Sequence, residues 1–180
     1  MTFRTTPAPP SEPPRRLRLR PPPEPFRIVL LEPEIPQNTG SISRTCVATG
    51  STLHLIEPLG FRIDEHAVRR AGLDHWPHLA LSVHASWAEF LAARPGQRLH
   101  LFSATAERSY LDADVEPGDA FVFGRESVGL PPELLREHAA RVWAIPTAPA
   151  VRSLNLSNAV AVVLYEALRK TGALAETRRG

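Results

Sequence analysis

The chain has 180 residues, of which 43% are hydrophobic and 22% charged, a composition typical of one folded domain. No apolar run reaches the ~18 residues of a membrane-spanning helix, and the N-terminus lacks the apolar segment of a secretory signal. The single cysteine, Cys46, excludes an internal disulfide and fits a reducing cytoplasm, the location we expect.

The net charge of +2 conceals an uneven distribution. Residues 1–27 hold six arginines and two glutamates, whereas the remainder holds fifteen basic and seventeen acidic residues. Strong attraction to nucleic acid therefore has to come from the N-terminal segment or from a local patch.

The N-terminal segment also has an unusual composition, because nine of the nineteen prolines lie in residues 1–25. Such a segment buries too little apolar surface to fold. We therefore expect a disordered tail at residues 1–26, a single domain at residues 27–172 and a C-terminal tail at residues 173–180. The arginines of residues 15–20 either contact RNA phosphates or belong to a solvated extension.

The first predicted strand spans residues 27–32, and a loop containing proline and glycine leads from it into a helix that Gly50 ends. Ile42, Cys46 and Val47, at helical spacing, are expected to face the core, whereas Arg44 falls on another face. From the residues alone, Arg44 is either an ordinary surface arginine or part of a site.

A second strand is expected at residues 52–56, followed by a turn and a short helix that carries Arg69 and Arg70. These two cations could dock a phosphate or simply complement the dipole at the helix end. The spacing of His75 and His78 suggests a metal site. Since no cysteine and no convincing acidic partner accompanies them, we expect no metal.

Strands and helices continue to alternate through the second half of the chain. We expect strands at residues 79–84, 98–103, 120–124 and 141–145, and helices at residues 86–93, from residue 131 onward and at 156–170. This alternation predicts an α/β fold with a mostly parallel sheet flanked by helices. The absence of G-x-G-x-x-G, P-loop and G-x-S-x-G motifs disfavours dinucleotide, P-loop nucleotide and serine hydrolase sites.

Three loops of unusual composition follow predicted strands: the loop after Ser103, residues 124–130 and residues 146–155. Because ligands bind beyond the carboxyl ends of parallel strands, we expect these loops to converge on one ligand. Gly124 directly follows a strand, where a glycine lets the backbone approach a ligand closely. The third loop ends at a helix N-terminus, which favours an anionic or hydrogen-bonding ligand.

These loops resemble a known family. Arg152-Ser153-Leu154-Asn155-Leu156-Ser157-Asn158 resembles the third motif of the SPOUT-class RNA 2′-O-methyltransferases, and residues 124–131 match the second. The segment from Asn38 to Arg44 matches the first. The resemblance covers residues 28–172 and is closest to the branch that methylates the ribose of the tRNA wobble nucleotide (position 34). The Arg-Arg-Ala-Gly-Leu-Asp run at residues 69–74 also resembles that branch.

The resemblance implies a fold and a cofactor that the hydrophobic pattern does not predict. The fold includes a C-terminal trefoil knot, a rare topology. The cofactor is S-adenosyl-L-methionine, held largely through backbone groups in a bent conformation. The residues that the resemblance assigns to cofactor binding are Phe102, Gly124, Ile145, Ser153 and Leu154.

The resemblance assigns proton abstraction from the ribose hydroxyl to Arg44. A guanidinium stays protonated at ordinary pH, so we expect Arg44 to stabilise the developing alkoxide while a phosphate or water takes the proton. Asn38, Glu126 and Asn155 are expected to hold the ribose, the loops and one another, and Arg152 to contact an RNA phosphate. Asn155 is alternatively an ordinary helix N-cap.

The expected partners are tRNA and a second copy of the chain, since no additional RNA-binding domain is evident and the family forms homodimers. One alternative is a 2′-O-methyltransferase that acts on another tRNA or rRNA position. Another is a non-catalytic RNA-binding protein of the same fold, which the presence of Arg44, Glu126, Ser153 and Asn155 disfavours.

Overall fold

A computed structural model of the chain describes residues 17–19, 21–62, 75–174 and 178–179. The helix expected to carry Arg69 and Arg70 lies outside these residues. No helix in the described part of the chain is long and apolar enough to cross a membrane.

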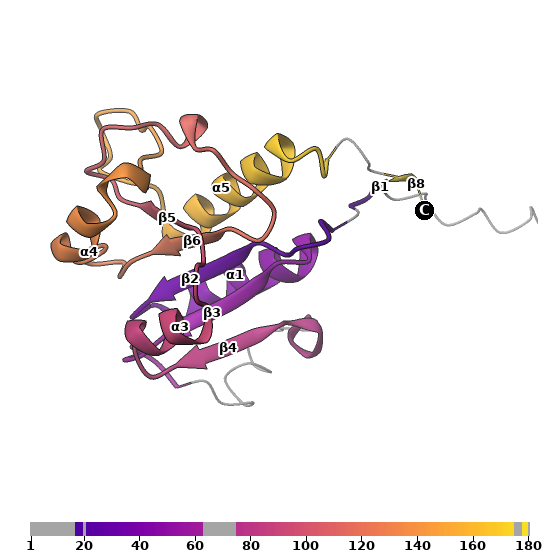
Figure 1. The fold of residues 1–180 in the computed structure, drawn as a ribbon, viewed down its shortest axis with the longest axis horizontal. Helices are drawn as coiled ribbons and strands as arrows, with labels where there is room; N and C mark the ends of the chain where they lie inside the picture. The colour runs from indigo at the N-terminus through magenta and orange to yellow at the C-terminus, as the bar shows by residue number, and fades with distance from the viewer. Residues whose placement is uncertain (1–16, 20, 63–74, 175–177, 180) are drawn as a thin grey trace, which may run out of the picture.

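Six strands form one sheet in which every pair of neighbours is parallel, as the sequence predicted. The strand order is β4-β3-β2-β6-β5-β7. Their bounds are β2 Arg27–Leu31, β3 Thr52–Ile56, β4 Leu81–His84, β5 Leu99–Phe102, β6 Ala120–Phe123 and β7 Val142–Trp143. The order places β6, from the second half of the chain, beside β2, from the first half (Figure 1).

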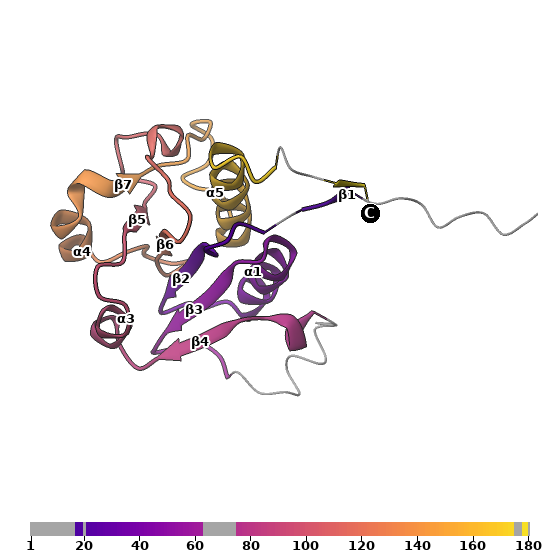
Figure 2. The ribbon, with the colours of Figure 1, turned by 45° about the vertical axis from the view of Figure 1, so that its right-hand side comes forward.

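In the part of the chain that the structure describes, two helices cover each face of this sheet (Figure 2). Their bounds are α1 Pro36–Thr49 and α5 Leu156–Lys170 on one face, and α3 Trp87–Ala93 and α4 Pro132–Glu137 on the other. The strands are apolar on both sides, which is typical of a parallel sheet buried between two helical layers. In β2, Ile28 packs in the same core cluster as Ile42 of α1, and Val29 in the same cluster as Phe90 of α3.

The helix ends follow local chemistry. Gly50 has a left-handed backbone (φ 68°) and closes α1, as predicted. The predicted span of α5 is confirmed, and Asn155 caps it by accepting a hydrogen bond from the Ser157 amide. The first helix differs, because Ile35 occupies its N-cap position and supplies no side-chain cap.

Five strands are shorter than predicted. β2 and β6 each end one residue early, at Leu31 and Phe123. β4 begins at Leu81, because the preceding Trp76–His78 forms a 3₁₀ turn. β7 contains only Val142–Trp143, because a second 3₁₀ turn, Ala139–Arg141, precedes it and only two of its residues pair with β5. β5 is one residue shorter at each end than predicted. β7 lies at the edge of the sheet and pairs there with β5 alone, while Ala144, directly after it, forms an isolated bridge with Ser109.

The expected tails lie partly outside the described residues. Within them, β1 (Leu17–Arg18) pairs antiparallel with β8 (Arg178–Arg179), and Phe26 is fully buried in the core beside Phe121. The division into tails and one domain stays a prediction, and so does the trefoil knot.

Candidate functional site

The loops that follow β2 and β6 lie at the same edge of the sheet, because these strands are parallel neighbours. The start of α5 reaches the same edge, where its N-cap Asn155 contacts the beginning of α1. The three segments that the sequence singled out as motifs therefore meet. The convergence expected from the strand ends involved another set of loops: the loop after Ser103 and part of residues 146–155 line one cavity, which residues 124–130 do not line.

Glu126 lies at the centre of this meeting point. Its carboxylate accepts hydrogen bonds from the amides of Glu34 (2.8 Å) and Ile35 (3.3 Å) and from the side-chain Nδ2 of Asn38 (3.0 Å). A carboxylate at a helix N-terminus complements the helix dipole. Glu126 thus binds, from a distant loop, the segment that leads into α1 and the side chain of Asn38 in its first turn.

Asn38 connects Glu126 to the third motif. It is buried, and its Oδ1 accepts a hydrogen bond from Asn155 Nδ2 at 3.0 Å. The Oδ1 of Asn155 in turn accepts from the amide and the hydroxyl of Ser157. The structure therefore brings three predicted residues into one chain of hydrogen bonds, and Asn155 is both a helix cap and part of that chain.

Glu34 belongs to the same cluster, and the sequence analysis assigned it no role. Its carboxylate accepts hydrogen bonds from the guanidinium of Arg125 and from the amide and hydroxyl of Ser127. The hydroxyl, the amide and the guanidinium lower the pKa of Glu34. The sequence offered one signal, a glutamate two residues before the proline that begins α1, but its partners lie more than ninety residues away.

Gly124 begins a tight loop whose two ends are hydrogen-bonded to each other. Arg125 and Gly129 exchange backbone hydrogen bonds of 3.2 and 2.8 Å, and Gly129 has a positive φ of 76°. A Cβ on Gly124 would lie 2.2 Å from the carbonyl carbon of Gly129 and 2.3 Å from the amide nitrogen of Leu130. Glycine is therefore required here for the loop to close on itself.

Arg44 lies on the exposed face of α1, while Ile42 and Cys46 of the same helix are fully buried. The helical spacing predicted this division for these three residues, whereas Val47, also expected to face the core, is only partly buried. Arg44 is carried by α1, and the segment that leads into this helix is held by Glu126.

A cavity of about 340 Å³ opens beyond the carboxyl ends of β5 and β7. Two predicted residues, Ile145 and Arg152, line it. Its remaining wall combines small apolar side chains with hydroxyl and charged groups: Ala104, Ala106, Glu107, Arg108, Ser109, Ala144, Pro146 and Thr147. Its volume falls within the roughly 300–1,000 Å³ of small-molecule sites.

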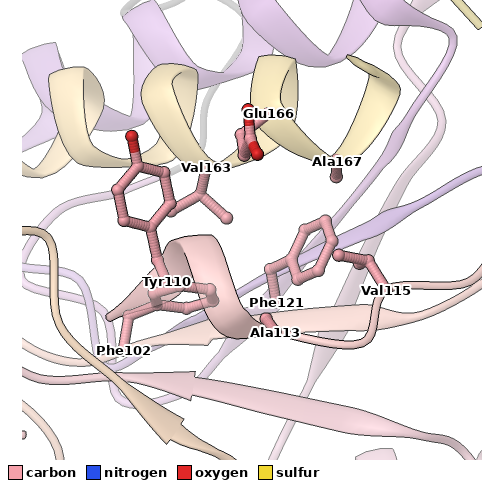
Figure 3. A pocket seen from close by; sticks show the side chains of 8 residues that line it. All are labelled: Phe102, Tyr110, Ala113, Val115, Phe121, Val163, Glu166 and Ala167. Carbon is pink, nitrogen blue, oxygen red and sulfur yellow. The ribbon is translucent and has the colours of Figure 1, made fainter. Parts of the chain in front are cut away.

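Phe102 lies apart from that cavity. Its ring stacks on Phe123 at 4.8 Å between centroids, and it lines a separate apolar void between the sheet and α5 (Figure 3). This void measures about 10 Å³, and Glu166 lines it from α5, whereas Tyr110 lines it from the turn after β5. It is at most large enough for a single water. The side chain of Phe102 is therefore part of the core, and a contact with a ligand at the sheet edge would come from its backbone.

Ser153 and Leu154 lie on the exposed loop before α5, where 37% of Leu154 is accessible. The structure places them next to Asn155 in the chain but outside the linings of both cavities.

A buried network supports the wall of the larger cavity. His100 is hydrogen-bonded to Asp119 at 2.9 Å and accepts from the indole Nε1 of Trp143 at 3.1 Å. The guanidinium of Arg108, a cavity residue, lies 4.2 Å from the centre of the Trp143 ring. The side chains below the cavity are therefore held in place by mutual contacts.

Among the described residues, no group of three or more metal-ligating side chains is found. His75 is instead bonded to Ser43 of α1, with 2.8 Å between His75 Nε2 and Ser43 Oγ.

Comparisons with known proteins agree with this geometry. The sequence profile of the SpoU rRNA methylase family matches residues 25–165. A tRNA (cytidine(34)-2′-O)-methyltransferase from Burkholderia pseudomallei is 48% identical over 150 residues, which are 82% of this chain and 96% of that protein.

Two solved structures extend the similarity to three dimensions. One, described as giving structural insights into 2-OH methylation of C/U34 on tRNA, has a TM-score of 0.78 and 48% identity, with 83% of this chain and 97% of the other covered. The other, an AdoMet-bound rRNA methyltransferase from Sinorhizobium meliloti, has a TM-score of 0.72 and 26% identity, covering 85% and 61%.

Proposed function

The chain belongs to the SpoU rRNA methylase family, and we propose that it transfers a methyl group from S-adenosyl-L-methionine to the ribose 2′-hydroxyl of the wobble nucleotide of tRNA, a cytidine or modified uridine. The observation that carries the proposal is its similarity, over nearly their whole length, to tRNA (cytidine(34)-2′-O)-methyltransferases.

The larger cavity suits the cofactor chemically. The apolar wall formed by Ile145 and its alanine and proline neighbours can cover an adenine face, and the hydroxyl and charged groups can meet the polar ends of the molecule. Gly124, Ser153, Leu154 and the backbone of Phe102 would complete the contacts at the edge of the sheet. When bound, the cofactor supplies an electrophilic methyl group on a sulfonium centre.

Arg44 would act on the attacking ribose oxygen. Because its guanidinium keeps its proton, it stabilises the negative charge that develops on the 2′-oxygen. The hydroxyl proton then passes to a phosphate oxygen of the RNA or to water. The chain thus contributes mainly position and charge, which can account for a large part of a rate enhancement.

The hydrogen-bonded chain of Glu126, Asn38 and Asn155 supports this arrangement. It joins the helix that carries Arg44 to the loop of Gly124 and to the start of α5. Arg152, exposed at the mouth of the larger cavity, is positioned to contact an RNA phosphate.

The proposal includes a homodimer that binds tRNA in the cytoplasm and requires no metal. Val162 and Tyr165, three residues apart on α5, are 36% and 47% exposed. Apolar side chains at this spacing form one stripe on a helix, which suits contact with a second copy.

The test is methyl transfer from labelled S-adenosyl-L-methionine to total tRNA from a strain that lacks the protein, followed by mapping of the label. We expect label on the ribose of nucleotide 34, lost with Arg44→Ala. Arg136→Ala is the control, because Arg136 is an exposed helical arginine on α4, and it should keep full activity.

Three other outcomes would each reject a different part of the proposal. Label on another nucleotide would retain the reaction and reject the wobble assignment. Label on ribosomal RNA alone would reject tRNA as the substrate. Absence of both labelling and cofactor binding would reject the methyltransferase assignment.

A further inference from the structure

Hydrogen bonds run in both directions between the loop that contains Glu34 and the loop that contains Glu126. The carboxylate of Glu126 accepts from the amide of Glu34, at 2.8 Å. The carboxylate of Glu34 accepts from Arg125 and Ser127, the two neighbours of Glu126. The loop after β2 and the loop after β6 are thus joined twice. The Glu126 carboxylate binds the backbone of the first loop, and the Glu34 carboxylate binds residues of the second.

The Glu34 carboxylate uses both oxygens. Oε1 accepts from Arg125 Nη2 at 2.9 Å, Arg125 Nε at 3.1 Å and Ser127 Oγ at 2.9 Å, while Oε2 accepts from the Ser127 amide at 2.9 Å. Bonds to an ionised acceptor are stronger than neutral ones, and the two bonds from one guanidinium fix orientation as well as distance. A neutral amide in place of this carboxylate would present an N–H₂ group to one of these donors.

Charge balance explains how two glutamates can lie so close together. Arg125 pairs with Glu34 and also lies 3.7 Å from Glu32. Glu126 is matched by the positive end of α1. Glu126 therefore has the helix end as its positive partner, whereas Glu34 and Glu32 share Arg125.

The backbone around Glu34 also packs against Gly60. Gly60 donates its amide to the carbonyl of Pro33 at 2.9 Å. A Cβ on Gly60 would come within 2.8 Å of Glu34 Cα, so the two backbones are in close contact. Glu34 therefore presents its carboxylate from a fixed position.

We propose that Glu34 is a positioning residue of the methyl-transfer site, which holds the Gly124–Leu130 loop at a set distance from α1 and hence from Arg44. This inference rests on the proposed function. Without the bonds to Glu34, the Gly124–Leu130 loop could still bind the cofactor and the RNA. Its position relative to α1, the helix that carries Arg44, would vary. Small displacements of reacting groups reduce turnover steeply, by as much as about a hundredfold for ~1 Å.

The experiment compares Glu34→Gln, Arg125→Gln and the double variant in steady-state methylation of tRNA, with cofactor affinity and Tm measured on the same preparations. We expect kcat to fall at least about tenfold in each single variant, while the KM for tRNA and the Kd for the cofactor change less than about threefold. The double variant should be no slower than the slower single variant, because both changes remove the same link.

Glu133→Gln is the matched control, since Glu133 pairs with Arg136 across an exposed ion pair on α4, and it should retain full kcat. Unchanged kcat in Glu34→Gln, or a loss that follows a lowered Tm and is restored by cooling, would overturn the positioning role. If the wild type failed to methylate tRNA, the proposed function would fail. The link would then be tested separately by hydrogen exchange at the Ser127 amide, which should quicken in Glu34→Gln and stay slow in Glu133→Gln.

Discussion

The side-chain amide of Asn155 donates to Asn38 Oδ1 at 3.0 Å, although 117 positions separate these residues. This bond joins the N-cap of α5 to the first turn of α1, and Asn38 passes the connection on to Glu126. The site is therefore held together by side chains from three separate parts of the chain.

Substitutions at Asn155 can separate its role as the N-cap of α5 from its hydrogen bond to Asn38. Asn155→Asp keeps an oxygen for the Ser157 amide but cannot donate to Asn38, whereas Asn155→Ala loses both contacts. We expect both variants to lose methyl-transfer activity, and Asn155→Ala to lose about 1 kcal/mol more of stability, the usual value of an N-cap. Urea denaturation and methyl-transfer rates measure the two effects. Equal stability of the variants would contradict the capping role.

Gly124→Ala should prevent closure of the β6 loop, because the added carbon would overlap the backbone at Gly129. We expect a loss of about 2 kcal/mol or more, typical of overpacking, with weakened cofactor binding. Gly96→Ala is the control: nothing lies within 4 Å of its Cβ position, and only its positive φ opposes the change. That variant should lose about 1 kcal/mol and keep its affinity for the cofactor. Gly124→Ala with wild-type affinity would contradict the prediction.

Arg44→Lys tests whether a guanidinium is required rather than a positive charge. Lysine offers a compact charge without the planar arrangement of donors. We expect kcat to fall at least about tenfold with little change in stability, because Arg44 is exposed on α1. Arg136→Lys on α4 should change neither quantity. An Arg44→Lys enzyme that kept most of its turnover would count against a specific guanidinium role.

His54 should make folding stability dependent on pH. It is buried and hydrogen-bonded to His84 at 3.1 Å, and burial, followed by the charges of Arg94, His84 and Arg27, lowers the pKa of His54 to about 3. An unfolded histidine titrates near ~6.5, so between these values only the unfolded chain takes up the proton. Stability is therefore complete above pH ~6.5 and falls as the pH drops, by up to about 1.4 kcal/mol per unit from this group.

Urea denaturation of the wild type and His54→Gln between pH 7 and pH 5 measures this effect. The variant should show a flatter dependence, whatever its absolute stability. His78→Gln, at an exposed histidine, should keep the wild-type slope. Identical slopes in all three proteins would show that His54 is not the group responsible.

Cys46 should be unreactive in the folded protein. It is fully buried in α1, and burial raises the pKa of its thiol to about 12. The thiolate is the reactive form, so we expect no modification by iodoacetamide at pH 8 under native conditions and complete modification in urea. Mass spectrometry gives the extent directly, since the chain has one cysteine. Rapid alkylation of the native protein would contradict its burial.

Much of the secondary structure could be predicted from the sequence, because its signals are local. The span of α5, the end of α1 at Gly50 and the strand at Thr52–Ile56 all follow from apolar periodicity together with caps and turn residues within a few positions. The alternation of strands and helices predicted the parallel sheet, and with it the edge where the motif loops meet.

Features that depend on residues far apart in the chain were determined only by the tertiary structure. The order β4-β3-β2-β6-β5-β7 and the shortness of β7 arise from pairing between strands, which no single strand encodes. The same holds for the site: the sequence alone selected Glu126 and Asn38 only through a resemblance, and it assigned no role to Glu34. The partners of that carboxylate lie 91 to 93 residues away, and only the packing of β2 beside β6 brings them within hydrogen-bonding distance.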